Sequence, residues 1–97
     1  MRIIARAALK AFWQRHADAE QPLKAWFREA RTADSAKPRD VKRAYRTASV
    51  IGDNRVVFNI GGNKYRLVVK FNYHYRVGYI RFIGTHAQYD AIDAEKI

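Results

Sequence analysis

Apolar residues in the first half of the chain recur at the three- and four-residue spacing that is typical of amphipathic helices. This spacing predicts a helix over Arg6–His16, preceded by a brief strand at Arg2–Ala5, and a second helix in which Pro22 is an early position. The two helices form a helical hairpin. The small and polar residues of Ala33–Arg39 predict a loop, and a short basic helix is expected over Asp40–Arg46. The apolar positions that set the pattern are Ala8, Leu9, Phe12 and Trp13 in the first helix, and Leu23, Trp26 and Phe27 in the second.

The second half of the chain changes to the alternation of apolar and polar residues that predicts β-strands. Strands are expected over Arg55–Ile60 and Tyr65–Tyr73, and Gly61–Asn63 between them supplies the residues of a hairpin turn. After a further turn at His74–Arg76, a third strand is expected over Val77–Ile83. Three consecutive strands joined in this way form an antiparallel meander.

The last segment of the chain carries a helix-start signal. Thr85 followed by Gln88 matches a capping box, so a short helix is expected to begin at His86. The sequence therefore predicts a single domain over residues 1–97 of the α+β class. In this domain the N-terminal helical hairpin packs on a small antiparallel β-sheet, and a short C-terminal helix follows.

The predicted strand over Tyr65–Tyr73 has two chemically different faces. Its two-residue period places basic side chains on one face and core side chains on the other. On the next strand, Arg81 can lie near Arg66 if the register of the hairpin permits. The predicted faces hold Lys64, Arg66, Val68 and Lys70 on the basic side, Tyr65, Leu67, Val69 and Phe71 on the core side, and, on the next strand, Tyr79, Arg81 and Ile83 opposite Ile80 and Phe82.

The composition adds a strong positive charge to this fold. The chain has 19 Lys and Arg against 9 Asp and Glu, which gives a formal net charge of +10 and a pI near 10.3. No carboxylate lies between Asp53 and Asp90, and this interval interleaves basic residues with tyrosines. Cations and aromatic rings without competing anions are typical of surfaces that bind a polyphosphate such as a nucleic acid.

Several functional classes are excluded by residues that the chain lacks or spaces wrongly. There is no cysteine, which excludes disulfides and thiolate-bound zinc, and the three histidines do not have the spacing of a metal site. Gly61 and Gly62 join strand to strand and lack the spacing of a nucleotide-binding loop. No apolar run is long enough to cross a bilayer, and Met1–Ile4 lacks the apolar segment of a secretory signal. A cytoplasmic protein without metal or cofactor is therefore expected.

Four residues are candidates for chemistry on or beside the basic face. Arg66 and Arg81 would repel each other unless an anion lies between them, and guanidinium groups bind phosphate in a bidentate manner. His86, at the expected helix start, can transfer a proton near neutral pH, and Tyr89 follows one turn later. The alternative is that the arginines are ordinary solvated strand residues, that His86 completes the helix cap and that Tyr89 belongs to the core.

The segment from Val57 to Asp90, VFNIGGNKYRLVVKFNYHYRVGYIRFIGTHAQYD, resembles the signature region of HigB toxins, a branch of the RelE superfamily. It contains a phenylalanine-asparagine-x-glycine-glycine-asparagine turn, an arginine-bearing strand and a threonine-histidine-x-x-tyrosine-aspartate ending. The resemblance implies a RelE-like fold and a ribonuclease toxin that cuts messenger RNA on the ribosome. The implied partners are a HigA-like helix-turn-helix antitoxin, mRNA and the ribosome.

The resemblance also implies roles for individual residues. RNA cleavage by the 2′-hydroxyl group needs a base, cations for the oxyanion and an acid for the leaving oxygen, and it requires no metal. Arg66 and Arg81 would stabilise the phosphate, and His86 would transfer a proton, with Tyr89 as its neighbour or as a base-stacking contact. Asp90 can orient His86 or interact with the helix dipole. The expected RNA-binding residues are Lys64, Lys70, Asn59, Asn63, Arg43 and Arg46, of which the last two can instead bind the antitoxin.

Two other functions are compatible with the same sequence features. A non-catalytic RNA-binding module can use a basic sheet with its tyrosines as stacking platforms. A ParE-like toxin has the same scaffold and acts on DNA gyrase without nuclease chemistry. A neighbouring gene for a short helix-turn-helix protein would favour a toxin over an isolated binding module.

Overall fold

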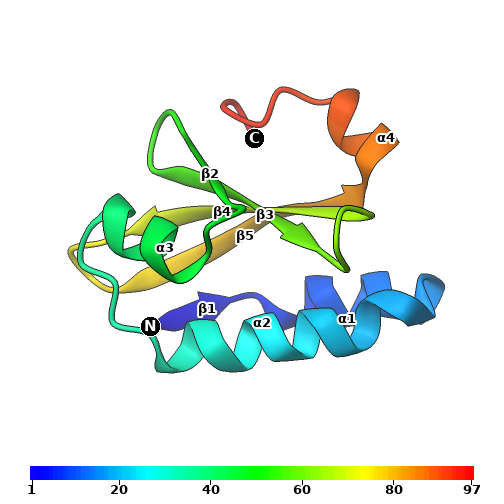
Figure 1. The fold of residues 1–97 in the computed structure, drawn as a ribbon, viewed down its shortest axis with the longest axis horizontal. Helices are drawn as coiled ribbons and strands as arrows, with labels where there is room; N and C mark the ends of the chain where they lie inside the picture. Colours follow the sequence, from blue (N-terminus) through cyan, green and yellow to red (C-terminus); the bar gives the residue numbers. More distant parts are fainter.

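The computed structural model describes residues 1–97 as one β-sheet with helices on both sides (Figure 1). The strands are β1 (Arg2–Ile4), β2 (Ser49–Ile51), β3 (Arg55–Ile60), β4 (Tyr65–Asn72) and β5 (Val77–Thr85). The helices are α1 (Arg6–Arg15), α2 (Glu20–Thr32), α3 (Pro38–Ala44) and α4 (His86–Asp90), with a short 3-10 helix, η1 (Ala17–Ala19), between α1 and α2. None of the helices is both long enough and apolar enough to span a membrane.

The five strands form one sheet in the order β1-β5-β4-β3-β2. Strands β2 to β5 pair antiparallel, whereas β1 pairs parallel with β5. The expected three-strand meander is confirmed as the centre of the sheet, and the expected antiparallel pairing holds for β2 to β5 but not for β1. The sequence pattern does not predict the edge strand β2, because it has only three residues and two of them are exposed.

The helical hairpin covers one face of the sheet, here called the inner face. α1 and α2 lie below the sheet in Figure 1, and their apolar stripes pack on the strands. Leu9 and Leu23 have no exposed surface, and Trp26 is 3% exposed. Burial of each such large side chain stabilises the fold by about 1.5–3 kcal/mol, so the inner face holds the main core. The strand residues of this core include Val56, Phe58, Leu67, Val69 and Phe71.

A β-bulge in β5 changes which residues face the core. Val68 is opposite Phe82, but the next residue of β4 is opposite Ile80, so Arg81 is the extra residue of the bulge. Because the bulge shifts the two-residue period, Ile83 packs against the main core, whereas Phe82 packs against a small cluster on the other face. The expectation that Ile83 shares the face of Arg81 is therefore wrong.

The turn and cap residues are as the sequence predicts. Gly61 and Gly62 have φ values of 63° and 72°, a region that favours glycine, and they connect β3 to β4. Thr85 Oγ1 accepts a hydrogen bond from the Gln88 main-chain nitrogen at 3.2 Å, and Gln88 Oε1 accepts one from the Thr85 nitrogen at 2.9 Å. The capping box that starts α4 is confirmed. α3 begins at Pro38, before the expected start, because proline is favoured in the first helical turn.

Candidate functional site

The face of the sheet opposite the helical hairpin, here called the outer face, carries the basic strand residues. Helix α4 and the segment that follows it lie on this side, across the sheet from α1 and α2 (Figure 1). Arg66 is opposite Gly84, and Lys70 is opposite Tyr79 in the next strand. Arg66 and Lys70 are separated by an even number of residues along β4, so their side chains share the outer face, as expected.

Arg66 is held at the start of β4, and only 9% of its surface is exposed. One terminal nitrogen of its guanidinium group donates hydrogen bonds to the carbonyl oxygens of Asn63 at 3.1 Å and Tyr65 at 3.3 Å. The other terminal nitrogen donates to Asn63 Oδ1 at 2.8 Å. All three acceptors are neutral, and none of the ion pairs in the structure involves Arg66. A buried cation without a counter-ion is costly, so this position favours an anionic ligand.

Helix α4 presents a histidine that is paired with a carboxylate. His86 Nδ1 lies 3.0 Å from Asp90 Oδ2, one helical turn further along. The main-chain nitrogen of His86 donates to the carbonyl oxygen of Lys64 at 3.2 Å, which fixes the start of α4 beside the start of β4. A carboxylate on one ring nitrogen orients the imidazole and leaves the other nitrogen for proton transfer. Of the two roles that the sequence allows for Asp90, this geometry supports orientation.

Tyr89 belongs to a small apolar cluster in the middle of the outer face. The ring centroids of Tyr89 and Phe82 are 6.4 Å apart. Val57, Val68 and Ala94 are buried in the same cluster. Tyr89 therefore packs against the sheet, as the alternative interpretation of the sequence states, and a part in proton transfer or base stacking stays a prediction.

Arg81 lies in a hollow of about 510 Å³ together with Lys70 and Tyr79. Arg81 is exposed and takes part in no ion pair. Tyr79 is 39% exposed, which leaves part of its ring free to contact a ligand. Cations, an exposed ring and side-chain amides are the groups that contact nucleotides in single-stranded RNA. The other residues that line the hollow are Asn54, Phe71, Asn72, Tyr73 and His74.

The two arginines of the sequence prediction belong to separate groups on the outer face. Arg66 is opposite Gly84, and the pair formed by Val68 and Phe82 lies between Arg66 and the bulge at Arg81. The expectation that the two arginines lie near each other around a single phosphate is therefore wrong in its geometry. The register of the β4–β5 hairpin is the reason, because it places Gly84 and not Arg81 opposite Arg66.

Six of the eight residues that line the hollow were not predicted as site residues from the sequence, and three of them show why. Asn54 precedes β3, His74 lies in the turn between β4 and β5, and Tyr79 points outward from β5. The first two belong to turns that are distant in sequence, and only the pairing of β3, β4 and β5 brings those turns to one end of the sheet. The row of tyrosines among cations is the one signal that points to Tyr79.

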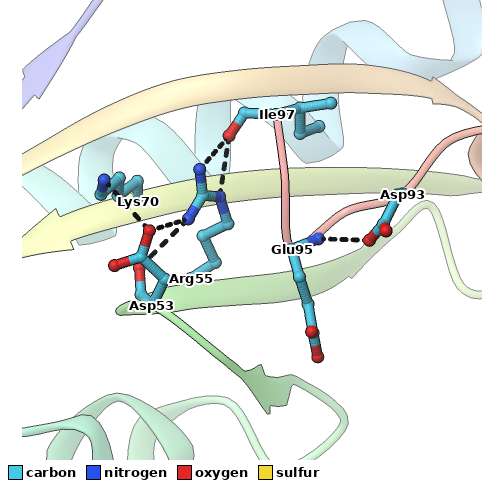
Figure 2. Close-up of polar contacts among 6 residues, drawn as sticks. All are labelled: Asp53, Arg55, Lys70, Asp93, Glu95 and Ile97. Carbon is cyan, nitrogen blue, oxygen red and sulfur yellow. Dashed lines mark hydrogen bonds and ion pairs between the residues drawn. The ribbon is translucent and has the colours of Figure 1, made fainter.

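The segment after α4 folds back over the outer face, where Arg55 anchors it (Figure 2). Arg55 is 4% exposed, and its Nε donates to the carbonyl oxygen of Ile97 at 2.8 Å. A terminal nitrogen of the same side chain donates to Asp53 Oδ2 at 2.7 Å, and Lys70 Nζ lies 3.4 Å from that oxygen. These contacts, Arg55 before Lys70, lower the pKa of the Asp53 carboxyl group. Asp53 thus partly neutralises the charge of Lys70, whereas Arg81 has no ion-pair partner.

Lys64 does not lie on the basic face, contrary to the expectation. Its Nζ forms an ion pair with Asp18 in η1, and the Tyr65 hydroxyl donates to the same carboxylate. The hydrogen bonds from Lys64 and then Tyr65 lower the pKa of Asp18, and the bond to Asp18 raises the pKa of both partners. The prediction fails because Lys64 belongs to the turn before β4, where strand alternation does not apply. The cluster instead joins the helical hairpin to the sheet.

The remaining predicted RNA-binding residues lie in different places. The side-chain oxygen of Asn63 accepts a hydrogen bond from Arg66. Asn59 lies opposite Arg66 on β3, and its side-chain amide donates to the carbonyl oxygen of Thr47 at 3.3 Å. Arg43 and Arg46 are exposed, on α3 and in the turn after it. α3 packs on the inner-face core through Val41, so it does not share a surface with α4. No group of three or more acidic or histidine side chains is placed to hold a metal ion.

A comparison with known protein families identifies the chain. The model of the family described as HigB_toxin, RelE-like toxic component of a toxin-antitoxin system, matches residues 19–92. No curated protein matched the chain. The matched range covers more than half of the chain and contains Arg66, Arg81, His86 and Tyr89. The chain therefore belongs to the HigB family of RelE-like toxins, the toxic components of toxin-antitoxin systems.

Proposed function

We propose that this toxin is an endoribonuclease that cleaves messenger RNA on the ribosome and so inhibits translation. One observation carries the proposal. At one end of the outer face, the start of α4 is fixed to the start of β4, so that the His86–Asp90 pair stands at the same end as the buried, uncompensated Arg66. A proton-transfer group and an unneutralised guanidinium group at the same end of one surface are suited to the cleavage of a phosphodiester.

The proposed reaction is an internal transesterification of RNA. The 2′-oxygen attacks the adjacent phosphorus, the bond from phosphorus to the 5′-oxygen of the next nucleotide breaks, and a 2′,3′-cyclic phosphate forms. The 2′-hydroxyl proton passes to a base, and the leaving 5′-oxygen receives a proton and becomes a hydroxyl group. His86, oriented by Asp90, serves one of these proton transfers, and Tyr89 or a lysine serves the other. Arg66 stabilises the charge on the phosphate oxygens, so the reaction requires no metal ion.

The hollow around Arg81 extends this site along the RNA. Arg81 is the exposed, unpaired cation of the outer face, and Tyr79 beside it exposes part of its ring. We infer that Arg81 and Lys70 bind a phosphate next to the scissile one, while Tyr79 stacks on a base. Arg81 then acts by holding the substrate in register rather than by contact with the reacting phosphate.

The proposed partners follow from this function and from the family. A toxic component implies an antitoxin, and we propose a HigA-like helix-turn-helix protein. Ribosome-dependent cleavage places the toxin in the cytoplasm, with mRNA and ribosome as its targets. Arg43 and Arg46, which are exposed on a different surface from α4, are proposed to contact ribosomal RNA or the antitoxin.

Cleavage by purified components tests the proposal. The toxin is incubated with an end-labelled mRNA, either free or positioned in the decoding site of a ribosome. We expect cleavage only with the ribosome, and fragments that carry a 2′,3′-cyclic phosphate and a 5′-hydroxyl group. His86→Ala should slow cleavage by about 10²–10⁴-fold, whereas His16→Ala, which removes a histidine stacked on Phe12 at 4.3 Å on the helical side, should not.

Two results would overturn the proposal in different directions. Tight binding of RNA without any cleavage would make the protein a non-catalytic binding module. Intact transcripts in cells that carry poisoned gyrase would make it a ParE-like toxin.

A further inference from the structure

Asn63 holds the buried Arg66 side chain with two of its own oxygens. The main-chain carbonyl oxygen of Asn63 accepts a hydrogen bond from one terminal nitrogen of the guanidinium group at 3.1 Å, and Asn63 Oδ1 accepts one from the other terminal nitrogen at 2.8 Å. Asn63 is exposed and follows Gly61 and Gly62 in the turn between β3 and β4. Two contacts from one residue to two nitrogens fix the orientation of the guanidinium plane.

The two buried arginines of the protein are held by different chemistry. Arg55 and Arg66 are 4% and 9% exposed. A terminal nitrogen of Arg55 donates to the carboxylate of Asp53 at 2.7 Å (Figure 2). The acceptors of Arg66 are the two oxygens of Asn63 and the carbonyl oxygen of Tyr65, and all three are neutral. The charge of Arg55 is thus compensated by the group that holds it, whereas Arg66 is held without being neutralised.

The hydrogen bonds of Arg66 leave part of its guanidinium group free. Arginine has five N–H donors, and three of those of Arg66 donate to Asn63 and Tyr65. Buried side-chain atoms without a partner belong to Trp26 and Tyr73 only, so the Arg66 Nε–H group, which has no acceptor either, is open to solvent. Nε and the terminal nitrogen beside it form the edge with which arginine binds two oxygens of a phosphate. The contacts with Asn63 therefore hold Arg66 and leave a donor for a ligand.

The neutral side chain at position 63 matters for the charge of Arg66. Aspartate has the same shape as asparagine, and a hydrogen bond between charged groups is roughly twice as strong as one between neutral groups. A carboxylate at this position would therefore hold Arg66 more tightly than the amide does. It would also cancel the positive potential that attracts a phosphate. The amide gives up some stability and leaves the positive charge to the ligand.

We infer that Asn63 is a positioning residue for Arg66, which orients the guanidinium group toward the scissile phosphate and leaves its charge uncompensated. This inference rests on the proposed function, because that function assigns the cleaved phosphate to Arg66. It differs from the sequence expectation that Asn63 itself binds RNA, since Arg66 engages the side-chain oxygen of Asn63. A carboxylate in place of the amide should stabilise the fold and slow the reaction.

Two variants of this side chain separate positioning from structural support. Asn63→Asp and Asn63→Ala are compared with the wild type at pH 7, by thermal unfolding and by the cleavage rate at a saturating concentration of ribosome-bound mRNA. We expect Asn63→Asp to melt at or above the wild-type temperature and to cleave about 10²-fold slower, as after removal of a group that stabilises the oxyanion. Asn63→Ala loses one hydrogen bond but keeps the charge of Arg66, so it should melt at a lower temperature and cleave less than about tenfold slower. A purely structural role predicts the opposite order, in which the rate follows the stability.

Binding of inorganic phosphate tests the same point without cleavage. The Nε–H signal of Arg66 is followed by NMR spectroscopy as phosphate is added, and the loss of this signal in Arg66→Lys identifies it. We expect the signal to shift in the wild type and in Asn63→Ala, whereas Asn63→Asp should need at least about tenfold more phosphate for the same shift. The matched control is Gln14→Glu, which also converts an exposed amide to a carboxylate, on α1, and should bind phosphate and cleave like the wild type.

The outcomes separate this inference from the proposed function. If the wild type cleaves no RNA, the proposed function fails, whereas a phosphate response that only Asn63→Asp loses still supports the positioning of Arg66 for an anion. If Asn63→Asp binds phosphate like the wild type, or loses no more than Gln14→Glu, the inference is wrong. If Asn63→Ala slows cleavage as much as Asn63→Asp does, the amide acts on RNA directly or supports the fold, and the inference is overturned as well.

Discussion

The variant Arg66→Ala tests whether this arginine acts in cleavage or only stabilises the fold. The side chain donates two hydrogen bonds to Asn63 in the turn before β4 and one to the carbonyl oxygen of Tyr65 at the start of β4, at 2.8–3.3 Å, and it is 9% exposed. Each hydrogen bond makes a net contribution of about 1 kcal/mol to stability, and the freed oxygens of the exposed residue Asn63 regain water. We therefore expect a loss of about 2–3 kcal/mol in the free energy of unfolding. A small domain has about 5–15 kcal/mol in total, so the variant should remain folded.

The expected effect on cleavage is larger than the effect on stability. Removal of one group that stabilises the oxyanion lowers the rate by about 10²–10³-fold. The rate is measured with ribosome-bound mRNA, and the fraction folded is followed by denaturant unfolding of the same preparation. Arg66→Lys keeps the positive charge but cannot make the bidentate contact of a guanidinium group, so its cleavage rate should lie between those of Arg66→Ala and the wild type.

Arg76 supplies the matched control. Its guanidinium group also donates to the carbonyl oxygen three residues earlier, at Tyr73, and forms an ion pair with Asp34 at 2.9 Å. Arg76→Ala should therefore lose comparable stability and keep its cleavage rate. If Arg66→Ala is folded and cleaves within tenfold of wild type, or if both variants lose activity in parallel, the reasoning about Arg66 is refuted.

Further variants test other parts of the structure. Arg81→Ala should weaken substrate binding more than it lowers the rate at saturating substrate; an equal loss in both would place Arg81 at the reacting phosphate. Gly78→Ala should destabilise the fold by about 1–3 kcal/mol in a thermal melt, because a Cβ would lie 3.1–3.2 Å from Ile3, Phe71 and Val69, and an unchanged melt would contradict that packing. The pKa of Asp18 is lowered by Lys64 and then Tyr65, so its contribution to stability is present above about pH 3.8 and is lost as the pH falls through the lowered value. In Asp18→Asn, the free energy of unfolding should therefore fall less steeply between about pH 5 and pH 2 than in the wild type. The same fall in both proteins would refute the stabilising role of this cluster.

The sequence predicts those parts of the fold that depend on local chemistry. Gly61 and Gly62 fix the hairpin turn because their backbone needs positive φ, and Thr85 with Gln88 fixes the start of α4. The apolar stripes of α1 and α2 are visible because a helix repeats its buried positions. Such signals arise within a few residues, so no knowledge of the tertiary structure is needed.

The sequence does not predict features that depend on pairing between distant segments. The parallel pairing of β1 with β5 has no local signal, and the three residues of β2 are too few for a pattern. The register of β4 with β5 places Gly84 opposite Arg66, which separates the two arginines, and the bulge at Arg81 reverses the faces of the residues on its two sides. Lys64 reaches Asp18 through a turn, where side-chain direction follows the turn and not the strand.

The residues of the candidate site also fall into those that a local sequence signal predicts and those that only the folded sheet brings together. The sequence identifies His86 and Arg66 because the helix start and the middle strand are both locally encoded. The hollow around Arg81 combines residues from β4, β5 and two turns, so only the folded sheet assembles it.

Mapping of RNA 5′ ends in cells after brief induction of the toxin, with translation either active or blocked at initiation, is the most direct test of cleavage on the ribosome. We predict new 5′-hydroxyl ends inside coding sequences, which disappear when translation is blocked and are absent from cells that express His86→Ala at the same level. New ends that persist on untranslated RNA, or growth arrest without any new ends, would contradict it.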